Sequence, residues 1–331
     1  MFDPFNLTVD VILSLVIIIG LMTTMAYMTW FERRVISRFQ ARVGPNKTGW
    51  QGLMQPLADA IKLYFKEDIR PVQADRFLFV LAPAISLFAA LIAFAVVPIG
   101  PSIWISGVEI PLQVSDLPVG VVYLLGASSL GVYGLVLGGW GSGSKYSLLG
   151  ALRAAAQVVS YELILGVSIV SVVIVSGTMS MGGIVEAQSN SAWYVLLQPV
   201  AFILFMIAAV AETNRAPFDL PEAESELVAG YHTEYSGMRF AMYFIAEYVA
   251  MISMSAVAAT LFFGGWTFPF LPGGPWWLIL KMLFFLFLFV WLRATLPRLR
   301  YDQLMRLCWA VLLPIGLVNI AITAIIVAAI G

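Results

Sequence analysis

An acidic segment, AETNRAPFDLPEAESELVAGYHTEYSG at residues 211–237, has the composition to store and transfer protons. It contains one arginine, Arg215, and six acids, which are Glu212, Asp219, Glu222, Glu224, Glu226 and Glu234. Carboxylates packed together raise one another's pKa and titrate as a group, so such a cluster can hold exchangeable protons near neutral pH. The alternative is structural: acids at a helix N-terminus stabilise it through the helix dipole. That accounts for Glu222 and Glu224 but leaves Glu212, Glu226 and Glu234 unexplained.

The spacing of Asp219 and Glu222 is that of a capping box, and it predicts a short helix ending near Gly230. The segment is therefore expected to be an ordered acidic loop over residues 212–238.

Two further acids lie inside long apolar segments. Glu162 follows Arg153 by nine residues in RAAAQVVSYELILG, and Glu247 follows Arg239 by eight residues in RFAMYFIAEYVAM. At the rise of an α-helix, both lie about 12–14 Å from the arginine. A charge at such depth in a membrane costs at least about 2.5 kcal/mol, so each acid should face the bundle interior, be paired or be protonated. Two acids at matched depth favour a proton or cation route over a single buried acid satisfied by hydroxyl groups.

The composition of the whole chain is that of a membrane protein. Of its 331 residues, 61% are hydrophobic and 11% are charged, against about 25% charged residues in soluble domains. One cysteine, Cys308, and one histidine, His232, are too few for a Cys/His metal site, an iron–sulfur cluster or axial haem ligation, and they have no assignable role. The start, MFDPFNLTVD, lacks the basic region of a secretory signal, so the first apolar segment is expected to be retained.

Eight apolar segments have about the 20 residues that a membrane-crossing helix needs. They cover roughly 9–30, 77–97, 117–139, 153–175, 193–211, 239–262, 276–296 and 306–329. The third and fourth are rich in Gly, Ala and Ser, which favours close helix–helix contact. We therefore expect an all-α polytopic membrane protein that forms a single domain over 1–331.

The positions of lysine and arginine predict the orientation. Seventeen of the eighteen lie in or beside the segments 31–76, 140–153, 212–239 and 293–306, and Lys281 is the exception. Eight crossings with both termini outside place all four segments in the cytoplasm, where soluble partners can dock. Because the basic residues are segregated in this way and the net charge is −1, nothing indicates nucleic-acid binding.

The first cytoplasmic loop, 31–76, contains an amphipathic segment. After the turn signal Gly-Pro-Asn at 44–46, apolar residues recur at helical spacing: Met54, Leu57, Ile61, Tyr64 and Phe65. We expect a helix at the membrane interface, either as a surface anchor or as a wall of a lipid-accessible pocket. Asp59, between Ala58 and Ala60, is expected to face inward, and the arginines of this loop are expected to contact lipid phosphates.

Six segments together resemble a known family: ERRVISRFQARVGPN, QPLADAIKL, SYELILG, the acidic segment, AEY and LRATLPRLRYDQLM, in this order. They are similar to the H-subunit family of the proton-pumping NADH:quinone oxidoreductase, respiratory complex I, over essentially the whole chain. The resemblance implies eight membrane helices, quinone as substrate, and no bound metal, haem, flavin or iron–sulfur cluster in this chain. It implies a bacterial plasma (inner) membrane location, or the mitochondrial inner membrane for an organelle-encoded chain.

The resemblance also implies roles for individual residues. The chain would form the floor of a quinone chamber, whose tunnel would be lined or supported by Arg33, Arg42, Asp59, Ala60, Lys62, Arg215 and Phe218. Arg215 would pair with the acidic loop. A proton route would consist of Glu162, Glu212, Glu222, Glu224, Glu226 and Glu247. Where some family members carry a further acid in the third helix, this chain reads LLGASSLGVYG, so water or Ser128 and Ser129 would have to bridge the gap.

The implied partners are soluble iron–sulfur and quinone-site subunits on the cytoplasmic face, small membrane subunits, antiporter-like membrane subunits and membrane lipid. Two other functions stay open at this point. A stand-alone proton or cation transporter would also use intramembrane acids, but such folds show inverted repeats and no convincing internal repeat is found. A quinone-less relative in a membrane-bound hydrogenase or ferredoxin-linked complex would share the acidic motif, whereas the intact VGPN and QPLADA segments favour quinone.

Overall fold

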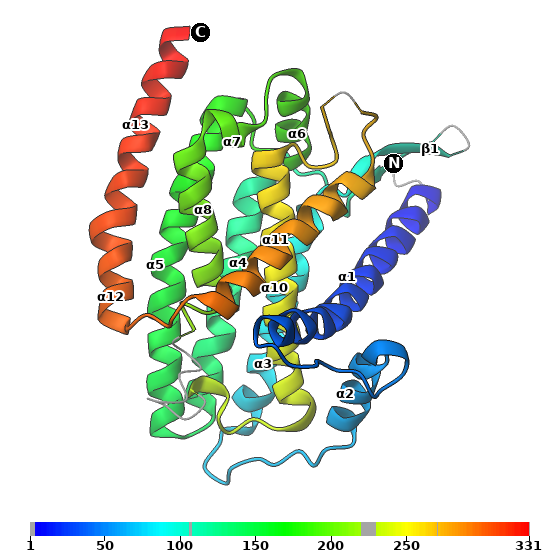
Figure 1. The fold of residues 1–331 in the computed structure, drawn as a ribbon, viewed down its shortest axis with the longest axis vertical. Helices are drawn as coiled ribbons and strands as arrows, with labels where there is room; N and C mark the ends of the chain where they lie inside the picture. Colours follow the sequence, from blue (N-terminus) through cyan, green and yellow to red (C-terminus); the bar gives the residue numbers. More distant parts are fainter. Residues whose placement is uncertain (1–3, 106–107, 220–229, 270, 331) are drawn as a thin grey trace.

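The computed structural model describes residues 4–105, 108–219, 230–269 and 271–330, and in these ranges the protein is a bundle of long helices (Figure 1). The principal helices are α1 (Pro4–Phe39), α3 (Arg76–Ala93), α4 (Gly120–Gly141), α5 (Lys145–Ser176), α8 (Pro199–Glu212), α10 (Gly237–Phe263), α11 (Pro275–Thr295) and α13 (Leu313–Ile330). The shorter helices are η1 (Trp50–Gly52), α2 (Gln55–Tyr64), η2 (Phe94–Val96), α6 (Met181–Asn190), α7 (Tyr194–Leu197), η3 (Gly230–His232), α12 (Tyr301–Arg306) and the π-helical η4 (Leu307–Leu312).

Seven helices in the described part of the chain are long and apolar enough to cross a membrane. The fifth expected span, 193–211, is not one continuous helix, because the helical conformation is interrupted at Gln198 between α7 and α8. Proline at position 199 disfavours a helical conformation of the preceding residue, which explains the break. α8 has 14 residues and rises only about 21 Å, less than the thickness of a bilayer core.

Polar side chains of α13 hydrogen-bond with the side chain of Gln198 at this break. Gln198 Nε2 donates to Thr323 Oγ1 at 2.9 Å, and Asn319 Nδ2 donates to Gln198 Oε1 at 3.1 Å. Asn319 also donates to Ser171 on α5 at 3.1 Å. Irregular backbone at membrane depth is tolerated where it is buried in protein in this way. The network therefore joins α13 to α5 and to the start of α8.

The purely helical prediction is wrong for residues 100–112. The strands β1 (Gly100–Ile105) and β2 (Val108–Leu112) pair antiparallel, with Trp104 opposite Glu109. Their sequences, GPSIWI and VEIPL, contain β-branched and aromatic residues that favour strands. A search for apolar segments of membrane-crossing length does not detect strands this short.

The expected close contact of the small-residue helices is confirmed. A Cβ atom on Gly134 of α4 would lie 2.9 Å from the carbonyl oxygen of Ala82 on α3. On the opposite side, a Cβ on Gly139 would lie 2.6 Å from the carbonyl oxygen of Ser147 on α5. α4 is thus held between two helices at distances that only glycine permits.

Lys281, the exception in the charge pattern, caps the end of α10. Its Nζ donates to the carbonyl oxygens of Phe263, Gly265 and Thr267 at 2.6, 2.8 and 2.6 Å. α10 ends at Phe263 and is followed by the C-cap residue Gly264, which has a φ of 71°. A cation at a helix C-terminus satisfies its carbonyl groups and interacts favourably with its dipole. The buried charge therefore has a structural role at the end of the bundle opposite the basic loops.

The helix ends beside the basic loops form one face of the bundle, which we call the basic face. It contains the C-terminal ends of α1, α4, α8 and α11 and the N-terminal ends of α3, α5 and α10. In Figure 1 this face lies toward the lower half, and the N-terminal end of α1 and the C-terminal end of α13 lie toward the top. Of the acids singled out from the sequence, Glu162, Glu212 and Glu247 lie on α5, α8 and α10, which have ends at this face.

Candidate functional site

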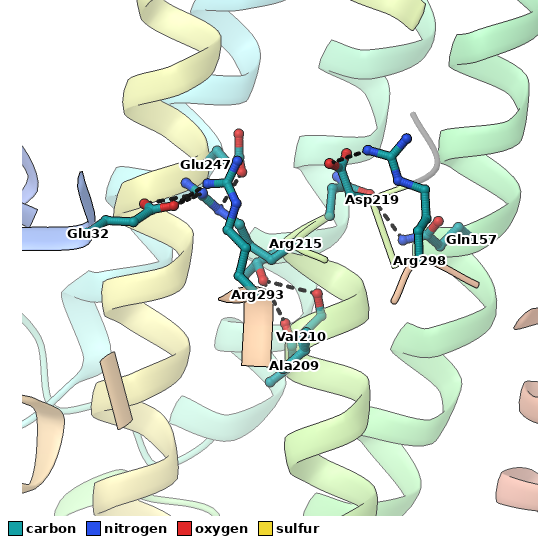
Figure 2. Close-up of polar contacts among 11 residues, drawn as sticks. Glu32, Gln157, Ala209, Val210, Arg215, Asp219, Glu247, Arg293 and Arg298 are labelled. Carbon is teal, nitrogen blue, oxygen red and sulfur yellow. Dashed lines mark hydrogen bonds and ion pairs between the residues drawn. The ribbon is translucent and has the colours of Figure 1, made fainter. Parts of the chain in front are cut away.

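Arg215 lies at the centre of a buried group of charges near the basic face (Figure 2). Its Nη1 donates to the two carboxylate oxygens of Glu32 at 3.0 and 3.3 Å, and its Nε lies 2.6 Å from Oε1 of Glu247. The side chains of Arg215, Glu32 and Glu247 are 6%, 4% and 13% exposed. Glu32 also accepts a hydrogen bond from Arg293. We call these four residues the Arg215 cluster; its charges sum to zero, as a buried set of charges requires.

Three helices and one turn bring the cluster together. Glu32 is on α1, Glu247 on α10 and Arg293 on α11, while Arg215 follows α8. The guanidinium lies 4.3 Å from the centroid of the Tyr248 ring, a cation–π contact. Burial alone would lower the pKa of Arg215, but Glu247 and Glu32 raise it well above the ordinary value. Arg215 is therefore a permanent cation shared by two carboxylates.

Glu32 and Arg293 were not recognised from the sequence. The first span was expected to end at residue 30, whereas α1 continues to Phe39 and includes FERRVISRF. The helix carries Glu32 into the interior although the hydropathy signal has ended. The sequence does contain one signal that the helix continues: Glu32 directly follows the apolar segment, and the residues after it are compatible with a helix.

A second ion pair lies beside the cluster. Arg298 Nη2 is 3.0 Å from Asp219 Oδ2, and the amide of Leu299 donates to the carbonyl oxygen of Pro217 at 3.0 Å. Burial raises the pKa of Asp219, and Arg298 offsets part of this shift. The segment after α11 is thus docked onto the turn after α8. The expected partner of Asp219 in a capping box, Glu222, lies outside the described residues.

A cavity of about 100 Å³ joins two of the predicted acids. Glu212 and Glu247 both line it, together with Ser86, Ser128, Tyr243 and Ser253. Among the described residues, Oε2 of Glu212 and Oγ of Ser86 are buried without a hydrogen-bond partner. The lining is mostly apolar, but the volume and these few polar groups suit a small number of ordered waters.

Ser128 and Ser129 on α4 contact two of the predicted acids. Ser129 Oγ donates to the Glu162 carboxylate, and Ser128 hydrogen-bonds with Glu212. The structure therefore brings Glu162, Glu212 and Glu247 into one connected region through α4 and the cavity.

The residues expected around quinone fall into separate groups. At the corner between α1 and α2, Arg33 Nη1 donates to Asp59 Oδ2 at 2.7 Å, and Gln55 Nε2 donates to Asp59 Oδ1 at 3.0 Å. Arg42, Ala60 and Lys62 are exposed near this corner. Phe218, by contrast, is buried in the core, with its ring centroid 5.5 Å from that of Tyr161.

The amphipathic helix is present as α2, and none of its residues is buried in this chain. Its apolar side chains Leu57, Ile61 and Tyr64 are exposed, as is Phe65 directly after it. The acids Glu222, Glu224 and Glu226, and with them the expected pairing of Arg215 with the acidic loop, lie outside the described residues.

His232 is buried among aromatic rings and stays neutral. The rings of Tyr231, Phe240 and Phe244 lie 4.9, 5.4 and 6.1 Å from it, and burial lowers the pKa of His232 to about 4. In an unfolded chain the value is about 6.5. The sequence left its role open, and the structure places it in the packing of η3 against α10.

We predict a loss of stability in acid that depends on His232. Between about pH 6.5 and pH 4 the unfolded chain binds a proton that the folded chain does not, so the stabilisation present above pH 6.5 disappears as the pH falls, by about 3 kcal/mol in total. Thermal unfolding in detergent between these pH values measures it. His232→Phe, which cannot titrate, should show a smaller acid shift, and an equal shift in both proteins would contradict the prediction.

Fold and site together define a class: a polytopic helical membrane protein with a charge-balanced, buried ionic cluster near one end of its bundle. A family model described as NADH dehydrogenase matches residues 12–324. The chain is 58% identical to the H subunit of NADH-quinone oxidoreductase from Thermomicrobium roseum, over 97% of this chain and 96% of the relative. It is 54% identical to an H subunit of the same enzyme from Geobacter sulfurreducens, over 95% and 93% of the two chains, and 53% identical to the one from Frankia casuarinae, over 96% and 72%. The chain belongs to the NADH dehydrogenase family of NADH-quinone oxidoreductase H subunits, which confirms the resemblance inferred from its motifs.

Proposed function

We propose that this chain forms the membrane floor of a quinone chamber and couples quinone reduction to proton translocation through buried glutamates. The observation that carries the proposal is the Arg215 cluster, in which one buried cation holds the carboxylates of Glu32 and Glu247. Glu247 also lines the cavity that contains Glu212. A change of charge near Arg215 would therefore act directly on a carboxylate that belongs to a possible proton path.

The proposed topology has eight crossings of the bacterial inner membrane, with the basic face in the cytoplasm and both termini outside. The distribution of lysine and arginine supports this orientation. The α7–α8 pair makes the fifth crossing, with the Gln198 network closing the break between its halves. The basic face is then the surface on which soluble iron–sulfur subunits dock, while small and antiporter-like membrane subunits pack against the sides of the bundle.

Quinone, the proposed substrate, enters from the bilayer at the corner between α1 and α2. A helix with exposed apolar side chains beside a basic loop suits the membrane interface. The pair between Arg33 and Asp59 fixes α2 against α1 and offers polar groups at the edge of an apolar surface. Phe218, buried against Tyr161, supports the chamber from below and does not line it.

The physical basis of coupling is a competition for one cation. Electrons from a neighbouring protein of the complex place negative charge above the cluster when quinone is reduced, and this charge attracts Arg215. Glu32 retains Arg293 when Arg215 moves, but Glu247 has no other ion pair among the described residues. A buried carboxylate that loses its cation takes up a proton, because desolvation disfavours the charged form. The cavity and Glu212 can supply that proton, and the serine pair on α4 continues the path to Glu162.

Relatives named as H subunits of NADH-quinone oxidoreductase, aligned along nearly the whole chain, favour this function over the hydrogenase-type alternative. No feature of the described residues specifically favours a stand-alone transporter.

Photo-crosslinking of the assembled complex with a quinone azide tests the quinone part of the proposal. We expect label in residues 33–62, at the corner between α1 and α2, and competition by excess unmodified quinone. Asp59→Ala should lower the labelling, whereas Asp302→Asn, at an exposed position beyond α11, should not. Label confined to other proteins of the complex, or insensitive to competing quinone, would contradict a quinone chamber on this chain.

A further inference from the structure

Gln157 on α5 is a fully buried amide that contacts the turn after α8 at several points. Its side chain is 0% exposed. Nε2 donates to the carbonyl oxygens of Ala211 and Phe218, both at 2.8 Å, and lies 3.3 Å from Oδ1 of Asn214. One amide group therefore touches the beginning, the middle and the end of the turn over residues 211–218.

This turn carries two charged groups of the proposed site. Glu212 directly follows Ala211, and Arg215 directly follows Asn214. Asn214 has a φ of 51°, a conformation that side-chain-bearing residues rarely adopt. The turn therefore depends on outside contacts for its shape, and a displacement of it moves Glu212 and Arg215 together.

The contacts require a hydrogen-bond donor at position 157. All three neighbours of Nε2 are oxygen atoms, so a carboxylate would be repelled by them and a thioether would leave them without a donor. Oε1 of Gln157 has no hydrogen-bond partner among the described residues. A buried acceptor without a partner is costly. The hydrogen bonds that Nε2 donates to the turn therefore have to offset the cost of the unpaired Oε1.

α5 is a firm base for these contacts. Tyr161, one turn after Gln157, packs its ring against Phe218 and donates to the carbonyl oxygen of Leu304 at 3.1 Å. The next residue of α5 is Glu162, an acid of the proposed route. The surface formed by Gln157 and Tyr161 thus fixes the turn relative to a helix that itself carries an acid.

We propose that Gln157 is a positioning residue whose amide holds Arg215 between Glu32 and Glu247 and thereby maintains the coupling of quinone reduction to proton movement. The inference rests on the proposed function and deepens it. Gln157 acts through Arg215 and Glu212, and it neither carries charge nor exchanges protons itself.

Two substitutions separate the donor from the shape of the side chain. Gln157→Met keeps the length and removes the donor, and Gln157→Glu keeps the shape but donates only when protonated. Charged groups on the segments around position 157 will influence this glutamate: Arg153, Glu162, Glu212, Arg215, Asp219 and Arg298. Arg153, one turn earlier on α5, and Arg298, which pairs with Asp219 directly after Phe218, favour its ionised form, whereas burial and the three oxygen atoms favour the protonated form.

The experiment measures protons transported per NADH oxidised by the assembled complex in vesicles, between about pH 6 and pH 8. We expect Gln157→Met to lower this ratio to roughly half or less at every pH, because the turn loses its donor. Gln157→Glu should lie near the unmodified protein at the acidic end and fall toward the methionine variant as the pH rises. If Gln157 only fills space in the core, the methionine and glutamate variants should show the same ratio at every pH.

Glu247→Gln, measured in the same preparation, separates the two levels of the argument. If it lowers the ratio and Gln157→Met does not, the positioning role is wrong and the proposed function stands. If Glu247→Gln leaves the ratio unchanged, the proposed function itself fails. Should Gln157→Met not assemble, Gln157→Glu decides alone. A ratio that falls, relative to that of the unmodified protein, as the pH rises supports the inference. A ratio with the same pH dependence as that of the unmodified protein overturns it.

Discussion

Replacing Arg215 with methionine is expected to abolish coupled activity and to lower the amount of assembled complex severely. The substitution leaves Glu247 buried without its cation and leaves Glu32 with Arg293 alone. Breaking a buried ion pair by removing one partner costs about 3–5 kcal/mol, a large part of the total stability of a protein. The measurements are the thermal midpoint of the purified complex and the rate of NADH-driven quinone reduction.

The matched control is Arg300→Met. Arg300 lies 3.8 Å from Asp302, and both side chains are more than three-quarters exposed. Exposed ion pairs contribute at most about 1 kcal/mol, so this variant should assemble and function normally. Equal effects of the two substitutions would show that burial of Arg215 is not what makes it important.

A second substitution should partly restore the Arg215 variant. Glu247→Gln removes the carboxylate that Arg215→Met leaves unpaired, so the double variant should assemble better than Arg215→Met alone. Such non-additivity is the signature of residues in direct contact. Additive losses in the double variant would contradict the ion pair at 2.6 Å that joins these two side chains.

The sequence predicted the parts of the site that depend on composition and depth. Glu162 and Glu247 were found because an acid inside an apolar segment is expensive, and Arg215 was found because it is the one arginine among six acids. Glu32 escaped because α1 continues for nine residues beyond its apolar part, and hydropathy does not report where a helix ends. The partners of a charge depend on which helices meet, and no pattern along one helix encodes that.

In the fold, too, features that depend on one segment are predictable, whereas features that depend on contacts between distant segments are not. The seven helices of the described residues that are long and apolar enough to cross a membrane follow directly from apolar length, since a segment that crosses a membrane must satisfy its backbone groups within itself. The division of the fifth span depends on Pro199 and on Gln198, whose partners Asn319 and Thr323 come from more than a hundred residues away. The burial of Phe218 likewise depends on its contact with Tyr161 of α5 and not on its own neighbours in the chain.

The glutamates of the proposed route should affect proton transport more than electron transfer. In vesicles containing the assembled complex, Glu247→Gln and Glu212→Gln are each expected to lower the protons moved per NADH oxidised severely. Glutamine keeps the approximate shape and the polar contacts of glutamate but cannot take up and release a proton. The two acids line the same cavity, so the double variant should lose little more than either single variant.

Glu186→Gln, an exposed acid on α6, is the matched control and should leave the ratio unchanged. Infrared difference spectra between the oxidised and the turning-over enzyme give an independent measurement. Carboxyl bands that change during turnover should disappear in the Glu247 and Glu212 variants and persist in the Glu186 variant.

If both cavity variants translocate protons normally, the cavity is not on the path, and Arg215 then serves only to stabilise the meeting point of α1, α8 and α10. A loss in one variant alone would show that the other acid is not part of the path, because a single connected chain fails wherever it is interrupted.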